Sequence, residues 1–204
     1  MTTPVDREKS SEERKGFTLV EMMVVVAIIG ILAGIAFVSM MHYRMVIRVN
    51  ATARDLAGQM RIARASAVKE GKSVLVNFNQ YLGTQNYQVG LDSAEDGTFD
   101  GFFHTYYLQP GIRFGYFPTI SAVPSHEYPV THPVEIKAGA GLYINKFHFR
   151  QDGTASYNGV AYLIPSNDLS ATGNRDDRCR AVDWEATTGR IRVWKWKFDD
   201  HTWR

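Results

Sequence analysis

Cysteine and catalytic motifs are what this 204-residue sequence has least of. The single Cys179 excludes an intramolecular disulfide and any metal site built from several cysteines. The sequence contains no serine elbow, no phosphate-binding loop and no glycine-rich nucleotide fingerprint. We therefore expect neither an enzyme nor a cofactor, and the net charge of +2 is too small to indicate a class of partner.

Metal ligands in a usable pattern are also scarce. His126 and Glu127 lie on the other side of a proline from His132 and Glu135, and zinc sites usually have tighter pairs than this. The acidic stretch 92–100 contains a glycine but lacks the twelve-residue helix–loop–helix arrangement of a calcium site. We interpret both stretches as polar loops and predict no metal site.

Proline is missing between Pro4 and Pro110, and charge is nearly missing from residues 17–41, where only Glu21 is charged. A helix of these 25 residues is about 37 Å long, enough to cross a hydrocarbon core of about 30 Å. The run is longer than the apolar core of a cleaved secretory signal, which has about 7–15 residues. We therefore predict a transmembrane helix over 17–41.

The residues before this run favour one orientation in the membrane. Segments rich in Lys and Arg remain in the cytoplasm, and residues 1–16 contain four such side chains, Arg7, Lys9, Arg14 and Lys15. Arg44 and Arg48 follow the apolar run and make the asymmetry small. We expect a cytoplasmic amino terminus, with the bulk of the chain beyond the membrane.

Residues 42–70 continue the helix by their pattern. Apolar residues recur every three or four positions and form one stripe: Val46, Val49, Ala53, Leu56, Ala57, Met60, Ala63 and Ala67. Gly71 is a suitable stop. The opposite face is basic, with Arg44, Arg48, Arg54, Arg61, Arg64 and Lys69. We interpret it as a solvated face, and binding of acidic lipid or nucleic acid is the alternative.

Residues 72–204 indicate a β-rich domain. About eight segments are rich in β-branched and aromatic residues and are separated by Gly, Asn, Asp, Pro and Ser. They are 73–79, 85–91, 102–108, 112–117, 142–149, 160–165, 179–186 and 190–198. The proline-rich segment 118–133 is predicted to be a loop. The expected fold class is α+β, with the long helix packed on a mainly antiparallel sheet.

Glu21 is unusual because a carboxylate within an apolar run is costly. It can be a polar residue tolerated near the membrane interface. It can also pair with a positive charge: cleavage between Gly16 and Phe17 would create an ammonium four residues earlier. In parallel helices, the amino terminus of one subunit could then meet Glu21 of another and set their register.

The stretch KGFTLVE, residues 15–21, resembles the type III signal of type IV pilins and pseudopilins. The resemblance implies that a prepilin peptidase cleaves after Gly16 and that Phe17 is then methylated. It also implies a role for Glu21 in filament assembly. The implied organisation is a pilin-like fold with a leader over 1–16, a transmembrane half-helix over 17–41, a periplasmic half-helix over 42–71 and a β-rich periplasmic domain over 72–204.

Two further stretches narrow the resemblance to the GspH/FimT family of minor pseudopilins. FHFRQDG, residues 147–153, resembles the F-x-x-D-G turn of that family, and TGRIR, residues 188–192, resembles its T-G-R-x-R hairpin. The implied protein is a minor pseudopilin of a type II secretion system. It would sit in the inner membrane by a single span and join other pseudopilins in a short filament for protein export. The alternative is a FimT-like minor pilin that binds DNA for transformation.

The last predicted strand carries the residues for that alternative. Side chains alternate from Arg190, so Arg192, Trp194, Trp196 and Phe198 share one face. That face is either core or an exposed aromatic and basic strip for nucleic acid. In the second case phosphates would meet Arg190, Arg192, Lys195 and Lys197. Arg190 has an equally good structural use, since it could pair with Asp183 or Glu185 across the hairpin.

Overall fold

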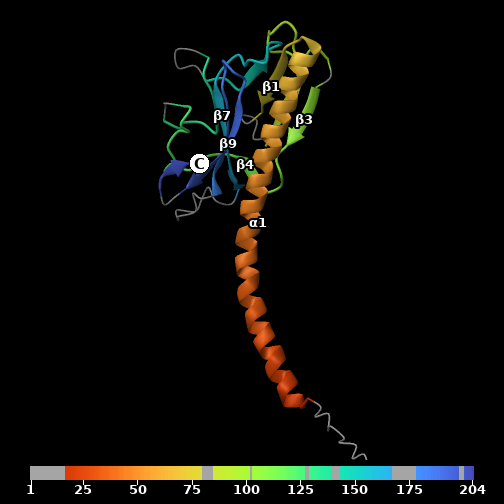
Figure 1. Cartoon of the computed structure of the whole chain (residues 1–204), viewed down its shortest axis with the longest axis vertical. Coiled ribbons are helices and arrows are strands. Elements are labelled where there is room, and N and C mark those ends of the chain that lie inside the picture. The colour runs from red at the N-terminus through yellow and green to blue at the C-terminus, as the bar shows by residue number, and fades with distance from the viewer. Residues whose placement is uncertain are drawn as a thin grey trace, which may run out of the picture. The chain divides into compact units, whose positions relative to one another are not determined.

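The computed structural model describes residues 17–79, 85–101, 103–126, 129–138, 143–166, 178–197 and 200–204 (Figure 1). Its first element is the helix α1, Leu19–Glu70. The chain forms two compact units, residues 1–42 and residues 43–204, and α1 contributes to both. Each unit is described by itself below.

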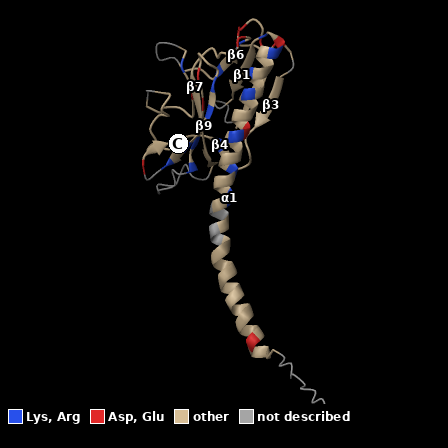
Figure 2. Cartoon of the chain, in the orientation of Figure 1, with Lys and Arg blue, Asp and Glu red and all other residues tan. Residues whose placement is uncertain are grey.

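The first unit contains an apolar helical segment, Leu19–Phe37, that is long enough to cross a membrane. Its 19 residues rise about 28 Å, close to the thickness of a hydrocarbon core. Every side chain in this segment is exposed. One acidic residue, Glu21, lies in the first turn (Figure 2). The segment has the length and composition expected of a membrane span.

The helix α1 ends as the sequence predicts. Gly71 has a φ of +63°, a left-handed conformation that L-residues with a side chain adopt at a cost. This conformation lets the Lys72 N–H donate to the Ala67 carbonyl at 3.3 Å, the six-to-one bond of a Schellman cap. The last-turn carbonyls would otherwise lack partners.

The second unit contains two antiparallel sheets. The smaller has the order β3-β2-β1-β6, formed by Phe103–Tyr107, Asn86–Leu91, Val74–Phe78 and Lys146–Phe149. The larger has the order β10-β9-β8-β7-β4, formed by Thr202–Trp203, Ile191–Lys197, Arg180–Trp184, Gly159–Pro165 and Ile112–Phe114. The strand β5, Val134–Ile136, also pairs with β7. The predicted α+β class is therefore confirmed.

One core lies between α1 and the sheets. The predicted apolar stripe of the helix is buried from Val49 to Ala67, and Val46 is half-buried. Opposite it, the Trp184 ring stacks on Phe147 with centroids 4.4 Å apart and on Phe78 at 5.8 Å. Aromatic stacking of this kind adds about 0.5–1.5 kcal/mol beyond the buried area. The helix is therefore fixed to the sheets by a large apolar contact.

A second core covers the other face of the larger sheet. Side chains of β7 alternate between the cores: Leu163 belongs to the first and Tyr162 to the second. Two further elements close the second core. The segment 115–126 supplies Phe117, Ile120 and Val123, and the strand β10 supplies Trp203. The predicted loop over 118–133 has no strand in its described residues, and it covers this face of the sheet.

Candidate functional site

The start of α1 is closed by a reciprocal cap between Thr18 and Glu21. The Glu21 N–H donates to Thr18 Oγ1 at 3.2 Å, while the Thr18 N–H and hydroxyl donate to Glu21 Oε2 at 2.8 and 3.0 Å. This arrangement is a capping box, and it gives partners to N–H groups that a helix start leaves unbonded. The sequence carries the signal for this cap as T-x-x-E at residues 18–21.

The predicted processing site, Gly16 and Phe17, lies partly outside the described residues. Phe17 is 78% exposed and Gly16 is not described, so cleavage between the two residues stays a prediction. The pairing of Glu21 with the amino terminus of another subunit needs a second chain and stays a prediction. Within one chain, Glu21 serves the cap.

The two stretches that carry the narrower family resemblance meet in space. The Ala155 N–H donates to the Ala186 carbonyl at 2.8 Å and so joins the turn at 152–153 to the turn at 186–189. The glycines of the two turns, Gly153 and Gly189, have φ angles of +80° and +60°. A Cβ atom on Gly189 would overlap the carbonyl oxygen of Gly153, so only glycine fits there.

An arginine of α1 holds both turns. Arg64 Nε donates to the Gly153 carbonyl at 2.7 Å, and Arg64 Nη2 donates to the Thr188 carbonyl at 2.9 Å. One helical turn earlier, Arg61 Nη2 donates to the Ile191 carbonyl at 3.2 Å. The prediction of a solvated face holds for Arg61, which is exposed, and is wrong for half-buried Arg64; both side chains nevertheless fasten the hairpin to the helix. Arg54 and Lys69 are exposed as predicted.

The hairpin places Arg192, not Arg190, beside the buried Asp183. The two residues face each other in the register of β8 and β9, and Arg192 Nη2 lies 2.8 Å from Asp183 Oδ2. Asp183 also accepts hydrogen bonds from Trp194 Nε1, at 3.0 Å, and from the Ser125 hydroxyl. Of the two acidic partners suggested for Arg190, Asp183 is therefore wrong, while the side chain of Glu185 accepts a hydrogen bond from the Thr188 hydroxyl at 2.9 Å. A buried carboxylate needs these partners, and Arg192 supplies the compensating charge.

The aromatic face of β9 has one described residue in the core, Trp196. Trp196 is 1% exposed, and its ring centroid lies 5.1 Å from that of Trp203. Trp194 is half-buried, with the Arg192 guanidinium 5.2 Å from its ring centroid. Phe198 lies outside the described residues. The core interpretation is confirmed for Trp196.

The four candidate DNA-binding residues do not share one environment. Arg192 pairs with Asp183, and Lys197 Nζ lies 4.0 Å from Asp200 Oδ2. Arg190 and Lys195 are exposed. A phosphate would therefore have to compete with a carboxylate at two of the four positions.

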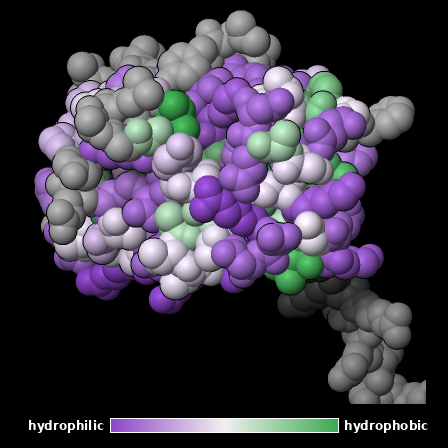
Figure 3. Space-filling view, turned by 90° about the horizontal axis from the view of Figure 1, so that it is seen from above, coloured by the Kyte–Doolittle hydropathy of each residue, from purple (hydrophilic) through white to green (hydrophobic). Residues whose placement is uncertain are grey.

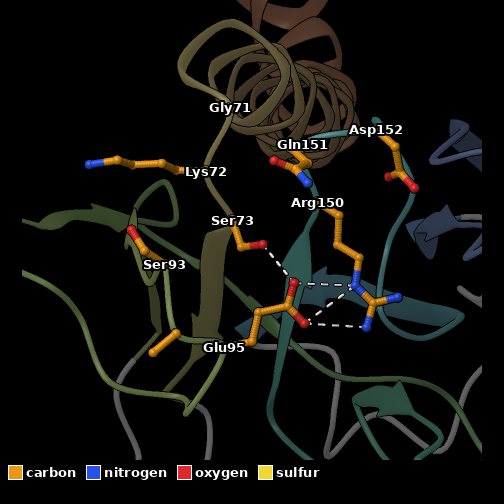
Figure 4. A pocket seen from close by; sticks show the side chains of 9 residues that line it. Gly71, Lys72, Ser73, Ser93, Glu95, Arg150, Gln151 and Asp152 are labelled. Atoms are coloured by element: carbon orange, nitrogen blue, oxygen red, sulfur yellow. Dashed lines mark hydrogen bonds and ion pairs between the residues drawn. The ribbon is translucent and has the colours of Figure 1, made fainter.

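A polar hollow of about 390 Å³ lies beside the end of α1 (Figure 4). Its main feature is Glu95, which accepts a hydrogen bond from Ser73 Oγ at 2.6 Å and another from Arg150 Nε at 3.2 Å. The hydrogen bond from Ser73, followed by that from Arg150, holds the pKa of Glu95 below its usual range. Arg150 belongs to the stretch 147–153, so this clamp ties that stretch to the loop before β3.

The histidine and carboxylate stretches considered for metals have structural partners. Glu135 is buried and accepts hydrogen bonds from the Thr131 N–H at 2.7 Å and the His132 N–H at 3.2 Å. Asp92, also buried, accepts from the Gly97 N–H at 2.7 Å and lies 2.8 Å from His148 Nε2. Within the described ranges, no group of three or more His, Cys, Asp or Glu is placed to hold a metal ion. Cys179 is buried.

The end of the second unit seen in Figure 3 is mostly hydrophilic, with small separate hydrophobic spots. A broad apolar patch is typical of a large permanent interface. The described surface in this view shows no such patch.

The amino-terminal signal of this chain matches a known sequence motif. The prokaryotic N-terminal methylation motif matches residues 13–37. The type IV major fimbrial protein FimA of Dichelobacter nodosus is 37% identical over 89 residues, covering 42% of this chain and 56% of FimA. The type IV major alpha-pilin of Moraxella bovis is 36% identical over 85 residues, covering 42% and 52%. The chain spans just over half the length of these curated relatives.

Two solved structures are similar at low identity. The type IV minor pilin FimU of Pseudomonas aeruginosa is 12% identical with a TM-score of 0.47, covering 71% of this chain and 87% of FimU. The minor pseudopilin EpsH of Vibrio cholerae is 11% identical with a TM-score of 0.44, covering 72% and 95%. Likeness at this level carries no functional argument. The chain therefore carries a prokaryotic N-terminal methylation motif, and it is similar to type IV fimbrial proteins over 42% of its length.

Proposed function

We propose that the protein is a minor pseudopilin of a type II secretion system, similar to GspH. The observation that carries the proposal is the contact between the two turns at Gly153 and Gly189, both of which accept hydrogen bonds from Arg64. These turns belong to the two stretches that resemble the GspH/FimT family, and they lie 36 residues apart in the sequence. Their direct contact gives a physical reason for both stretches to occur together.

In this proposal, a prepilin peptidase removes residues 1–16 and Phe17 becomes the methylated amino terminus. The segment Leu19–Phe37 holds the protein in the inner membrane, and the second unit lies in the periplasm. Assembly with other pseudopilins builds a short filament that exports folded proteins across the outer membrane. The protein contributes binding surfaces rather than catalysis, and the proposal includes no cofactor.

The alternative of a DNA-binding minor pilin has less support from the geometry. Arg192 and Lys197 lie beside Asp183 and Asp200, and a phosphate polyanion gains affinity mainly from cations that are available to it. Exposed Arg190 and Lys195 are the remaining pair in the described part of the hairpin.

A deletion strain separates the two functions. We expect deletion to abolish secretion of a folded exoprotein while leaving the frequency of transformation by exogenous DNA unchanged. Complementation with the double variant Arg190→Gln, Lys195→Gln should restore secretion as fully as the wild-type gene does. Arg192 is left intact because its removal would strand the buried Asp183. Normal secretion with lost transformation would instead support the DNA-binding alternative.

A further inference from the structure

The strand β3 ends the smaller sheet with a free edge. Among the described strands β2 is its one neighbour, and in Figure 1 β3 lies on the side of α1 away from β7 and β9. Its five residues, Phe103–Tyr107, pair with β2 in an unbroken register, from Asn86 opposite Tyr107 to Gly90 opposite Phe103. A bulge would bend the strand, and the register contains none. The backbone of β3 is therefore regular enough to accept another strand.

The bond at the end of β3 shows which of its residues face the free edge. The Leu108 N–H donates to the Gln85 carbonyl at 2.9 Å, so Leu108 faces β2. In an antiparallel pair, successive residues turn their N–H and C=O groups to opposite sides of the strand. The even-numbered residues of β3 therefore bond to β2, and the free edge receives the N–H and C=O groups of Phe103, Thr105 and Tyr107.

The other edges of the two sheets are short or covered, as edges in natural proteins usually are. The strands β4, β5 and β10 of the larger sheet have three, three and two residues. At β6, the Ser156 N–H donates to the His148 carbonyl at 2.9 Å, so the chain that follows covers that edge. The strand β3 has five residues, and none of them is Pro, Lys, Arg, Asp or Glu. It therefore lacks the features that normally keep a second strand from pairing with an edge.

The side chains at the free edge also suit an added strand. Those of Phe103, Thr105 and Tyr107 share one face of the sheet, and Phe103 and Tyr107 are 42% and 75% exposed. The Phe99 ring stacks on the Phe103 ring with centroids 4.7 Å apart, which holds the Phe103 ring in place. Aromatic side chains pair favourably with aromatic and β-branched ones on a neighbouring strand. The edge is therefore complementary to an extended segment with uncharged side chains.

We propose that β3 is a docking edge to which a neighbouring pseudopilin adds an extended segment as a further strand. This inference rests on the proposed secretion function, because that function supplies the neighbour. A minor subunit is outnumbered in its filament, so the chain beside it is expected to be a different pseudopilin. In strand addition the main-chain hydrogen bonds provide affinity, and alternate side chains, here Phe103 and Tyr107, provide specificity. Because both partners are anchored in one membrane, their effective concentration is high and a short strand suffices.

Thr105→Pro tests the edge without disturbing the rest of the sheet. The Thr105 N–H points away from β2, so its loss breaks no bond to that strand, and proline is tolerated at such positions of edge strands. The substitution removes the central donor and places a ring where the added strand would lie. Thr105→Val keeps the N–H and the shape of the side chain, so it is the matched control. Thermal unfolding of full-length protein in detergent should give both variants a Tm near that of the wild type.

Phe103→Lys is a second test variant that leaves the backbone unchanged. Its side chain is exposed at the free edge, so the fold should tolerate the substitution. A lysine on an edge strand opposes pairing with a further strand. This variant keeps the proposal testable even if proline at position 105 lowers the stability of the protein.

A photoreactive phenylalanine analogue in place of Tyr107 reports the neighbour in living cells. After irradiation we expect an adduct with another pseudopilin, and mass spectrometry of the adduct should locate the cross-link in an extended segment of that partner. Thr105→Val should leave the yield of the adduct unchanged. Thr105→Pro and Phe103→Lys should each lower the yield about tenfold, because the added strand loses hydrogen bonds to the edge.

Three results would overturn the docking edge. They are the absence of an adduct, an adduct with a second copy, a secreted protein or a lipid, and equal yields in Thr105→Pro and Thr105→Val. Each of them leaves the secretion function standing if deletion of the gene abolishes secretion and the protein co-purifies with other pseudopilins. Normal secretion by the deletion strain would instead refute the proposed function itself.

Discussion

Replacing Gly189 with alanine tests whether the contact between the two turns holds the hairpin on α1. The new Cβ atom would overlap the Gly153 carbonyl oxygen, and it would also crowd the side chain of Arg64. Because one obstacle is backbone, rotation of a side chain cannot relieve it. We expect the two turns to separate and the bond from Arg64 to the Gly153 carbonyl to break.

The magnitude follows from three contributions. A residue with a side chain at φ +60° costs about 1 kcal/mol relative to glycine. Loss of the charge-assisted bond from half-buried Arg64 costs about 1–2 kcal/mol. Displacement of the turn adds the loss of the bond between Ala155 and Ala186, about 1 kcal/mol. The total is roughly 3–4 kcal/mol, which corresponds to a fall in Tm of about 6–16 °C for a chain of this size.

Gly153→Ala is the matched control. Gly153 also has a positive φ, but its Cβ would lie 3.3 Å from the movable Arg64 side chain rather than against backbone. We expect a loss of about 1 kcal/mol, or roughly 2–4 °C in Tm. The assay is thermal unfolding of full-length protein in detergent, followed by near-ultraviolet circular dichroism. Equal losses for the two variants would refute the steric argument.

Three further predictions follow from the amino terminus and from the half-buried His126. Intact-mass analysis of membrane-extracted protein should show loss of 16 residues and a methylated Phe17; an uncleaved mass in a host with prepilin peptidase would contradict this. Glu21→Gln should retain the capping box but reduce co-purification with other pseudopilins, and wild-type co-purification would remove the charge-pairing role. Burial lowers the pKa of His126, so the stability that its neutral form provides should be lost as the pH falls below about 6.5. In chemical unfolding at pH 5–7, His126→Gln should make the free energy of unfolding less dependent on pH. Parallel curves of unfolding free energy against pH for the variant and the wild type would contradict this.

The local elements of the fold follow from the sequence because their causes are local. The stripe from Val49 to Ala67 repeats with the period of a helix, and Gly71 stops it by its conformation. The strands β5 and β10, of three and two residues, lie outside the predicted segments. Such short strands exist because a neighbour pairs with them: β7 in one case and β9 in the other.

The contacts between distant segments could not be obtained from periodicity. Arg190 and Arg192 lie two residues apart on the same hairpin. Only the register of β8 against β9 decides which of the two arginines faces Asp183. Arg64 looked like part of a solvated face because it lies off the apolar stripe. A long side chain at the edge of a stripe can reach over to main-chain carbonyls, and the sequence of the helix alone does not say which carbonyls those are.

The carboxylate of Glu21 illustrates how one residue can satisfy a local and an intermolecular requirement. A helix that begins at a membrane must give its first N–H groups partners, because lipid supplies none. Glu21 Oε2 already accepts both hydrogen bonds from Thr18, so the cap accounts for a polar residue at this position. Glutamine would do the same work in a capping box. The cap therefore explains the position and the hydrogen-bonding group but not the charge, and the charge is the part that an ammonium from a neighbouring subunit would use.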